Sequence, residues 1–283
     1  MSPATAGAGP TLRVALGEYD TGWHDPALSL SRAGDLIARA AKSRARLVVL
    51  PEMCTTGFSM EPGGHAEPLG GPQTAAFAKL AKLHDLWILA GLSMRDDVSP
   101  TLFNGAVFFS PSGDVNAIYR KQRLFTPSGE HEHYVAGDQP AVTIIDGVRV
   151  SPFICYDLRF PELFRAVAAD VDAFLLIANW PAARGAHWDV LVRARAIENL
   201  CHMVAVNRDG VGDGIAYDGR STAYGPWGEE LPDARSGREL AEGSTRPRIV
   251  ELDAANVAAT RAKYPFLRDR ADSLQPASSG RIG

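Results

Sequence analysis

Short apolar segments recur along the chain, and each ends at turn-forming or charged residues. Continuous or alternating apolar runs are typical of strands, whereas apolar residues spaced three and four apart indicate helices. The helical spacing occurs in Ser29–Lys42 and Thr74–His84, and helices are also expected from about His187 to Cys201 and after Ala254. The strand-like segments are Leu12–Gly17, Arg46–Leu50, Trp87–Gly91, Ala106–Phe109, Val115–Tyr119, Val142–Ile145, Val148–Val150, Ala173–Ala178, Met203–Val206 and Arg248–Leu252.

Hairpin signals are mixed into this alternation of helices and strands. Asp146-Gly147 is the strongest of them, and Ser110–Asp114 has the composition of a second hairpin loop. Arg208–Ser221 is rich in glycine and aspartate and is expected to be a loop. The mixture indicates a layered α/β fold with mixed sheets. No repeat or change of composition divides the chain, so a single domain is expected.

The composition is that of an ordinary globular protein. The chain has 283 residues, of which 46% are hydrophobic and 22% charged, so a sizeable core can form without a disulfide or metal. Its net charge of −4 argues against a nucleic-acid or anionic-membrane surface. The 3 cysteines include no CxxC pair and therefore indicate neither a disulfide framework nor a zinc site.

The chain carries no recognisable targeting segment. Residues 1–10 lack the basic region and the apolar run of a secretion signal, and they are expected to form a disordered tail. No apolar run is long enough to cross a bilayer. These observations predict a cytoplasmic protein whose thiols are reduced.

One cysteine stands where an apolar run meets polar residues. Cys155 follows Phe153-Ile154, and Pro161 suits the first position of a helix. Backbone N–H groups at such a strand-to-helix junction favour a thiolate and an oxyanion. The alternative is a small buried core cysteine, which is the commoner fate of a free thiol.

Two more reactive side chains follow apolar strands. Glu52 comes after Leu47–Pro51 and Lys121 comes after Ile118–Arg120. Strand ends at one edge of a sheet bring remote side chains together. A carboxylate that accepts the thiol proton and an ammonium that stabilises an oxyanion would complete an acyl-transfer site with Cys155. Taken singly, Glu52 and Lys121 could instead form a structural ion pair.

Other candidates are weaker. Cys54 is not at a helix junction, and Cys201 ends an apolar helix and is more typical of a core. His131 and His133 would share one face of a strand and could hold a metal, but no third and fourth ligands occur at suitable spacing.

The segments around these three residues resemble the nitrilase (carbon–nitrogen hydrolase) superfamily. The motifs are Pro51–Phe58, Tyr119–Phe125 and Cys155–Glu162, and the resemblance extends from Leu12 to Glu229. It implies a four-layer α-β-β-α sandwich with two mixed sheets in a single domain, residues 11–265. It also implies a homodimer or larger homo-oligomer, with residues 266–283 as an extension at the interface.

The same resemblance implies the role of each site residue. Glu52 is expected to be the general base, Lys121 the oxyanion stabiliser and Cys155 the nucleophile. Glu130 is expected to orient the lysine, and the backbone N–H of Tyr156 to be the second oxyanion donor. No cofactor and no metal are implied.

Further segments, among them Gly57–Met60, Glu130–Tyr134 and Ala178–Ala182, are similar to the bacterial ω-amidase branch of the superfamily. That similarity implies hydrolysis of a small ω-amide, such as 2-oxoglutaramate or 2-oxosuccinamate, to the acid and ammonia through a cysteine thioester. Arg159 suits a substrate carboxylate, although a salt bridge with Glu162 is an alternative. The expected substrate-binding residues are Arg159, Phe58, Asn179, Trp180 and His187.

Other functions stay open. One is an amidase or carbamoylase for another small carboxylated amide, such as an N-carbamoyl amino acid or deaminated glutathione. Another is a catalytically silent binding subunit on the same scaffold. Arg123 stands where many relatives have a histidine, which bears on substrate choice and not on the reaction class.

Overall fold

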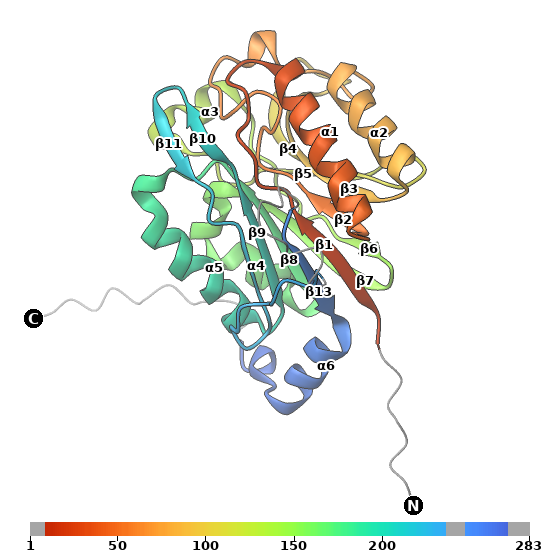
Figure 1. The fold of residues 1–283 in the computed structure, drawn as a ribbon. Helices are drawn as coiled ribbons and strands as arrows, with labels where there is room; N and C mark the ends of the chain where they lie inside the picture. Colours follow the sequence, from red (N-terminus) through yellow and green to blue (C-terminus); the bar gives the residue numbers. More distant parts are fainter. Residues whose placement is uncertain (1–8, 236–246, 271–283) are drawn as a thin grey trace, which may run out of the picture.

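Two β-sheets packed face to face form the centre of the molecule, with helices on both outer sides (Figure 1). The computed structural model describes residues 9–235 and 247–270. Residues 1–8 of the predicted tail and 271–283 of the predicted C-terminal extension lie outside the described residues.

The first sheet has six strands in the order β13-β1-β2-β3-β4-β5. β1, β2 and β3 are parallel, and the other pairs are antiparallel. The strands are β1 (Thr11–Leu16), β2 (Leu47–Val49), β3 (Trp87–Arg95), β4 (Leu102–Phe109), β5 (Val115–Arg120) and β13 (Ile249–Asp253).

The second sheet has five strands in the order β12-β9-β8-β7-β6. β7, β8 and β9 are parallel, so their carboxyl ends meet at one edge, while β6 and β12 pair antiparallel at the two sides. The strands are β6 (Thr143–Ile145), β7 (Val148–Ile154), β8 (Ala173–Ala178), β9 (His202–Asn207) and β12 (Thr222–Tyr224).

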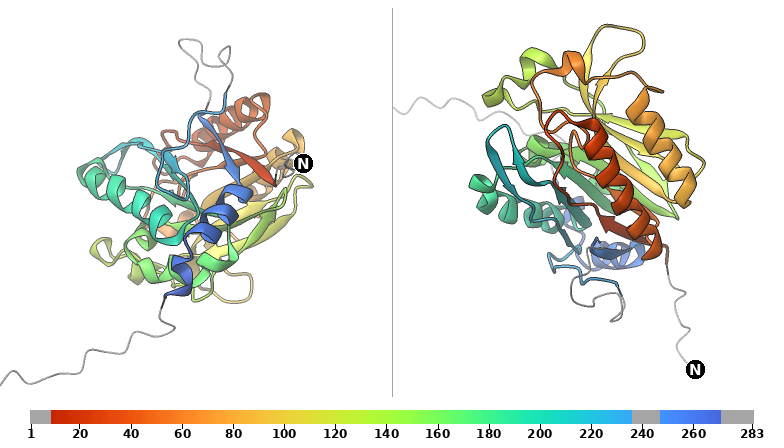
Figure 2. Two further views of the ribbon diagram at one scale, coloured as in Figure 1. Left: turned by 90° about the horizontal axis from the view of Figure 1, so that it is seen from below. Right: turned by 45° about the horizontal axis from the view of Figure 1, so that its top comes forward.

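Helices cover the outer face of each sheet, as the views in Figure 2 show. The alternation along β2 explains the layers: Val48 packs with α1 and α2, whereas Leu47 and Val49 lie in the core between the sheets. The predicted α-β-β-α sandwich is therefore confirmed. No helix of the described ranges is long and apolar enough to cross a membrane. The helices are α1 (Pro26–Lys42), α2 (Pro72–His84), α3 (Glu130–His133), α4 (Pro161–Val167), α5 (Gly185–Asn199) and α6 (Ala254–Lys263).

The predicted helices and strands are all present, with shifted ends. For example, α1 begins at Pro26, three residues before the predicted Ser29, because the Asp25 side chain accepts a hydrogen bond from the Leu28 amide and caps the helix. Such a cap is a local contact that apolar spacing does not reveal.

The prediction of a loop over Arg208–Ser221 was wrong. This segment contains the hairpin β10 (Asp209–Gly212) and β11 (Ile215–Asp218). Its turn residues Asp213 and Gly214 have φ values of 49° and 71°, as a tight hairpin requires. Glycine and aspartate are poor strand formers, so their abundance hid the two short strands.

Candidate active site

Cys155 directly follows β7 and opens a short 3₁₀ turn, Cys155–Arg159, before α4 begins. Its φ of 46° lies in the left-handed region, which is uncommon for a residue other than glycine. The residue is 9% exposed and lines a cavity. The predicted strand-to-helix junction is therefore present, with a strained backbone at the cysteine itself.

Asp157 holds this bend. Its Oδ2 accepts hydrogen bonds from the Ile154 amide at 3.0 Å and the Tyr119 hydroxyl at 2.8 Å. Its Oδ1 accepts one from the Arg123 amide at 2.9 Å. Burial raises the pKa of Asp157 to about 6, although these hydrogen bonds oppose the rise. The carboxyl group ties the cysteine turn to the segment after β5, a role that the sequence pattern does not assign to it.

Glu52, Lys121 and Glu130 form a fully buried cluster. The Lys121 Nζ donates to Glu52 Oε1 at 2.8 Å and to the two oxygens of Glu130 at 3.1 and 2.9 Å. All three side chains have no exposed surface. Segments that are 69 and 9 residues apart in sequence thus meet at one point, as the sequence analysis predicted.

Asn104, in the middle of β4, completes this cluster. Its Nδ2 donates to Glu52 Oε1 at 2.7 Å and to Glu130 Oε1 at 2.9 Å, so one amide bridges both carboxylates. The sequence analysis did not identify Asn104. A polar residue inside the apolar run Leu102–Phe109 was the signal that could have found it.

Asn179, just past β8, holds the other side of Glu52. The Asn179 backbone N–H donates to Glu52 Oε2 at 2.9 Å, and its Nδ2 donates to the Glu52 carbonyl at 2.6 Å. Gly91 of β3 allows the Glu52 backbone to lie close against that strand, because a Cβ there would be 2.5 Å from the Glu52 Cα. Asn179 therefore joins the second sheet to the acid of the first.

The electrostatics keep the proton on sulfur and the charge on nitrogen. Burial, followed by the negative charge of Glu52, raises the pKa of Cys155 well above its ordinary value, while Lys121 opposes the rise. Burial favours the neutral amine of Lys121, but Glu130 and Glu52 outweigh it and hold the pKa above the usual range. The resting site thus contains a neutral thiol next to an ion pair, and it needs a base.

The two rival cysteines lack such surroundings. Cys54 and Cys201 have no exposed surface, and burial raises the pKa of each to about 12. Neither lines the cavity that contains Cys155. Both therefore have the environment of inert core thiols.

The alternative metal site at His131 and His133 required both residues to lie on one face of a strand, which the structure does not show. These residues belong to helix α3 and not to a strand, so side chains two positions apart do not share a face. Both imidazoles are exposed. Glu130, one residue earlier, points instead into the buried cluster.

A cavity of about 100 Å³ opens beside the sulfur. Its walls come from five separate parts of the chain: the segment around Phe58, residues 125–128, the cysteine turn, the segment after β8 and the β10–β11 hairpin. The lining residues are Phe58, Phe125, Ser128, Cys155, Tyr156, Arg159, Asn179, Trp180, Pro181, Arg184, Ile215 and Tyr217.

The hairpin contributes Ile215 and Tyr217 to this wall, and a buried arginine anchors it. The Arg208 guanidinium lies 4.6 Å from the Tyr217 ring centre and donates to the Val211 carbonyl at 3.2 Å. The same group pairs with Asp20 at 2.9 Å. Because this segment was predicted to be a loop, the sequence analysis missed these wall residues.

The predicted substrate-binding residues fall into two groups. Phe58, Asn179, Trp180 and Arg159 line the cavity. His187 does not line it, and its Nδ1 lies 3.1 Å from the Arg159 Nη2. His187 is thus placed to orient the arginine.

The alternative salt bridge between Arg159 and Glu162 is absent from the structure. Glu162 instead lies 3.6 Å from the guanidinium of Arg123. Arg159 stacks over Trp180, with 4.8 Å from its guanidinium carbon to the ring centre. The guanidinium therefore faces the cavity, where a substrate carboxylate could bind.

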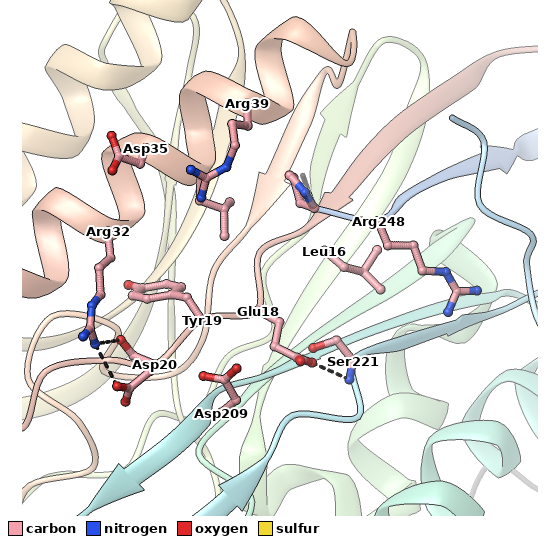
Figure 3. Close-up of a pocket in the computed structure, with 12 residues that line it drawn as sticks. Leu16, Glu18, Tyr19, Asp20, Arg32, Asp35, Arg39, Asp209, Ser221 and Arg248 are labelled. Carbon is pink, nitrogen blue, oxygen red and sulfur yellow. Dashed lines mark hydrogen bonds and ion pairs between the residues drawn. The ribbon is translucent and has the colours of Figure 1, made fainter. Parts of the chain in front are cut away.

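A larger cavity lies elsewhere, beside α1 and β1 (Figure 3). It has a volume of about 570 Å³, and no cysteine or lysine lines it. Several of its charges already have partners: Arg32 pairs with Asp20 at 2.8 Å, and Glu18 accepts the Ser221 amide at 2.9 Å. This cavity therefore lacks the groups that acyl transfer needs.

Comparison with known proteins shows which family this chain belongs to. A family model described as carbon–nitrogen hydrolase matches residues 13–262. An omega-amidase from Yersinia enterocolitica is 35% identical over 272 residues, which cover 92% of this chain and 96% of the relative. A 2-oxoglutaramate amidase from Bacillus subtilis (strain 168) is 33% identical and covers 89% of this chain and 95% of its own length.

A solved structure shows the same architecture. A carbon–nitrogen hydrolase superfamily protein from Xanthomonas campestris, with an arsenic adduct in its active site, matches with a TM-score of 0.83. The two sequences are 34% identical, and the match covers 94% of this chain and 99% of the other. This chain and that protein are therefore similar in both sequence and fold over nearly their whole lengths.

Proposed function

The chain belongs to the carbon–nitrogen hydrolase family and is an amidase; from this premise we propose that its substrate is a small ω-amide such as 2-oxoglutaramate or 2-oxosuccinamate. The observation that carries the mechanism is that Glu52, from one sheet, and Cys155, from the other, both contact Asn179. The Asn179 N–H donates to Glu52 Oε2 at 2.9 Å and its carbonyl lies 3.9 Å from the Cys155 sulfur, while Lys121 donates to the other oxygen of Glu52 at 2.8 Å. The names of the relatives, omega-amidase and 2-oxoglutaramate amidase, support the choice of amide.

Acylation begins when Glu52 accepts the proton of the Cys155 thiol and the sulfur attacks the amide carbon. The oxygen of the tetrahedral intermediate becomes negative and is held by the Lys121 ammonium and the Tyr156 backbone N–H. Glu52 then passes its proton to the departing nitrogen, so that ammonia leaves and a thioester remains. The raised pKa of Cys155 supports this order, because the thiol needs a base before it attacks.

Deacylation uses the same groups. Glu52 accepts a proton from water, the resulting hydroxide attacks the thioester carbonyl, and Lys121 again holds the oxyanion. Collapse of the second intermediate expels the sulfur, which regains its proton from Glu52, and the free acid departs. Glu130 and Asn104 act through Lys121 and Glu52, since both hold these side chains in place.

Substrate recognition uses the cavity beside the sulfur. The Arg159 guanidinium binds the carboxylate of the substrate, and His187 orients that arginine. Phe58 and Trp180 pack against the carbon chain, and Asn179 lies near the reacting amide. A cavity of about 100 Å³ suits a substrate of this small size.

Ammonia release from purified protein tests this function. The substrates are 2-oxoglutaramate, 2-oxosuccinamate, an N-carbamoyl amino acid, deaminated glutathione and a small nitrile, and Cys155→Ser is the inactive control. For deaminated glutathione, whose leaving group is a dipeptide amine and not ammonia, release of 2-oxoglutarate is measured instead. We expect the highest kcat/KM for the two ω-amides and no turnover in the variant. Faster turnover of the carbamoyl compound or of deaminated glutathione would contradict the proposed ω-amide substrate. A wild type as inactive as Cys155→Ser on every compound would indicate a binding subunit without catalytic activity.

We further propose that the protein is a homo-oligomer that acts in the cytoplasm. An exposed aromatic cluster supports self-association: Trp227 and Phe266 are 54% and 48% exposed and both lie against Tyr264. The 3 cysteines are free thiols, which is typical of a reducing compartment.

A further inference from the structure

The active-site cavity carries two cationic side chains and no carboxylate. Of the residues that line it, only Arg159 and Arg184 bear a full charge at neutral pH. The acids of the catalytic cluster, Glu52 and Glu130, have no exposed surface and are bound to Lys121. A ligand in this cavity therefore meets positive charge that its walls do not neutralise.

Among the residues that the structure describes, none accepts a hydrogen bond from the Arg184 side chain, so its donors are available to a ligand. Its guanidinium carbon lies 5.1 Å from the ring centre of Phe125 and 5.9 Å from that of Trp180. Within residues 9–235 and 247–270, no carboxylate lies at ion-pair distance from it, in contrast to Arg123, which pairs with Glu162. An arginine has five N–H donors and no acceptor, so the natural occupant is an anion.

The position of Arg184 is fixed by its neighbours. The Trp180 indole Nε1 donates to the Arg184 carbonyl at 2.9 Å. Asn207 in turn holds the Trp180 backbone, accepting from its N–H at 2.7 Å and donating to its carbonyl at 2.9 Å. Such support restricts where the guanidinium can reach, as a recognition group requires.

Arg159 and Arg184 both lie within 6 Å of the Trp180 ring. Two like charges in one partly enclosed cavity raise each other's energy, because little water screens them. A bound anion offsets this repulsion, and a group with two adjacent acceptor oxygens offers an acceptor to each arginine.

We propose that Arg184 is a specificity-determining residue that, together with Arg159, binds the carboxylate and the neighbouring 2-oxo oxygen of the substrate and rejects a 2-amino group. This inference rests on the proposed function. A 2-oxo acid offers only acceptors to the two guanidinium groups, whereas the ammonium of an amino acid amide is a cation that only donates. The pair thus selects 2-oxoglutaramate over L-glutamine, which has the same carbon skeleton.

The test measures kcat/KM with four amides: 2-oxoglutaramate, glutaramate, the methyl ester of glutaramate, and L-glutamine. The variants are Arg184→Gln, Arg184→Lys and the control Arg193→Gln, since Arg193 also stacks on an aromatic ring, Tyr224, but lies outside the cavity. We expect Arg184→Gln to lose about 10- to 100-fold with the two anionic amides. It should also narrow the preference for 2-oxoglutaramate over L-glutamine, and Arg184→Lys should recover part of the loss.

The neutral methyl ester distinguishes a role of Arg184 in binding the substrate anion from a role in holding the cavity wall in place. Its hydrolysis should stay within about twofold in Arg184→Gln, and all four rates should stay so in Arg193→Gln. Equal losses with the ester and the anionic amides would show that Arg184 only supports the wall, and unchanged rates would show that it does not bind substrate. A wild type that hydrolyses none of the carboxylated amides would instead refute the proposed function.

Discussion

Each charged side chain at the centre of the site is stabilised by partners from distant parts of the chain. Lys121 lies between Glu52 and Glu130, so the buried cluster has one positive and two negative charges. Buried charges are costly unless they are paired and hydrogen-bonded. Asn104 donates to Glu52 Oε1 and Glu130 Oε1, which Lys121 also contacts. The Asn179 N–H donates to the oxygen of Glu52 that Lys121 leaves open. Burial, together with the negative charge of Glu52, raises the pKa of Cys155 and so favours the neutral thiol over the thiolate.

Asn104→Ala tests the support given to the two carboxylates. The variant removes a donor shared by Glu52 and Glu130, and a hydrogen bond to a charged group contributes about 1.5–3 kcal/mol. We expect kcat to fall about 10- to 100-fold with little change in KM, because Asn104 does not line the substrate cavity. The matched control is Asn116→Ala, whose exposed amide lies on the next strand, and steady-state kinetics would contradict the role if both variants behaved alike.

Asp157 makes the stability depend on pH. Because burial raises its pKa to about 6 in the folded protein, the folded state holds this proton more tightly than the unfolded chain, whose value is near 3.8. This group therefore stabilises the fold most at low pH, and its contribution of about 3 kcal/mol disappears as pH rises from about 4 to 6.

Asp157→Asn removes this titration. Urea unfolding of both proteins at several pH values between 4 and 7 should show that the advantage of the wild type shrinks as pH rises. A difference in unfolding free energy that is constant, or that grows with pH, would contradict the assignment.

At the scale of the element, the hairpin β10–β11 shows where prediction from sequence ends. Strands such as β8 were predicted because a strand that is buried on both faces has a continuous apolar sequence. The hairpin is exposed at Val211 and Ile215 and has glycine at Gly210, Gly212 and Gly214, so no alternation marks it. Its conformation is set by contacts that sequence spacing does not contain, chiefly those of Arg208.

Arg208→Met tests that anchor. The substitution leaves Asp20 without its buried partner and removes the cation above the Tyr217 ring, so the hairpin should open more often. We expect KM to rise about tenfold and limited proteolysis to cut faster between residues 211 and 216. Arg220→Gln is the control, since its exposed ion pairs with Asp218 and Asp189 contribute little. Equal proteolysis of wild type and Arg208→Met would contradict the account.

At the scale of the whole molecule, the sandwich brings the ends of strands from both sheets to one place. Glu52 and Lys121 follow β2 and β5 of the first sheet, and Cys155 and Asn179 follow β7 and β8 of the second. Acidic, basic and nucleophilic residues that directly follow apolar runs can be recognised in the sequence, so Glu52, Lys121 and Cys155 were predicted as the candidate triad. Asn104, Asp157 and Arg184 were missed, because their importance depends on which remote segments they contact.

The exposed aromatic cluster gives a prediction about assembly. Trp227→Asp places a charge in the centre of the cluster formed with Tyr264 and Phe266. If this surface joins subunits, light scattering after size exclusion should show a smaller species than the wild type. Val98→Asp, at a side chain that is 96% exposed and outside the cluster, should leave the mass unchanged. An unchanged mass for Trp227→Asp would exclude the cluster from the interface.

The most direct test of the mechanism is the reactivity of the three thiols in the folded protein. Iodoacetamide carries an amide like that of the proposed substrate, and peptide mapping identifies which cysteine it has modified. The account predicts one modified residue per chain, Cys155, at a rate that falls at least about tenfold in Glu52→Gln, whose side chain cannot accept the thiol proton. Modification of Cys54 or Cys201, or an equal rate at Cys155 with and without the Glu52 carboxylate, would contradict it.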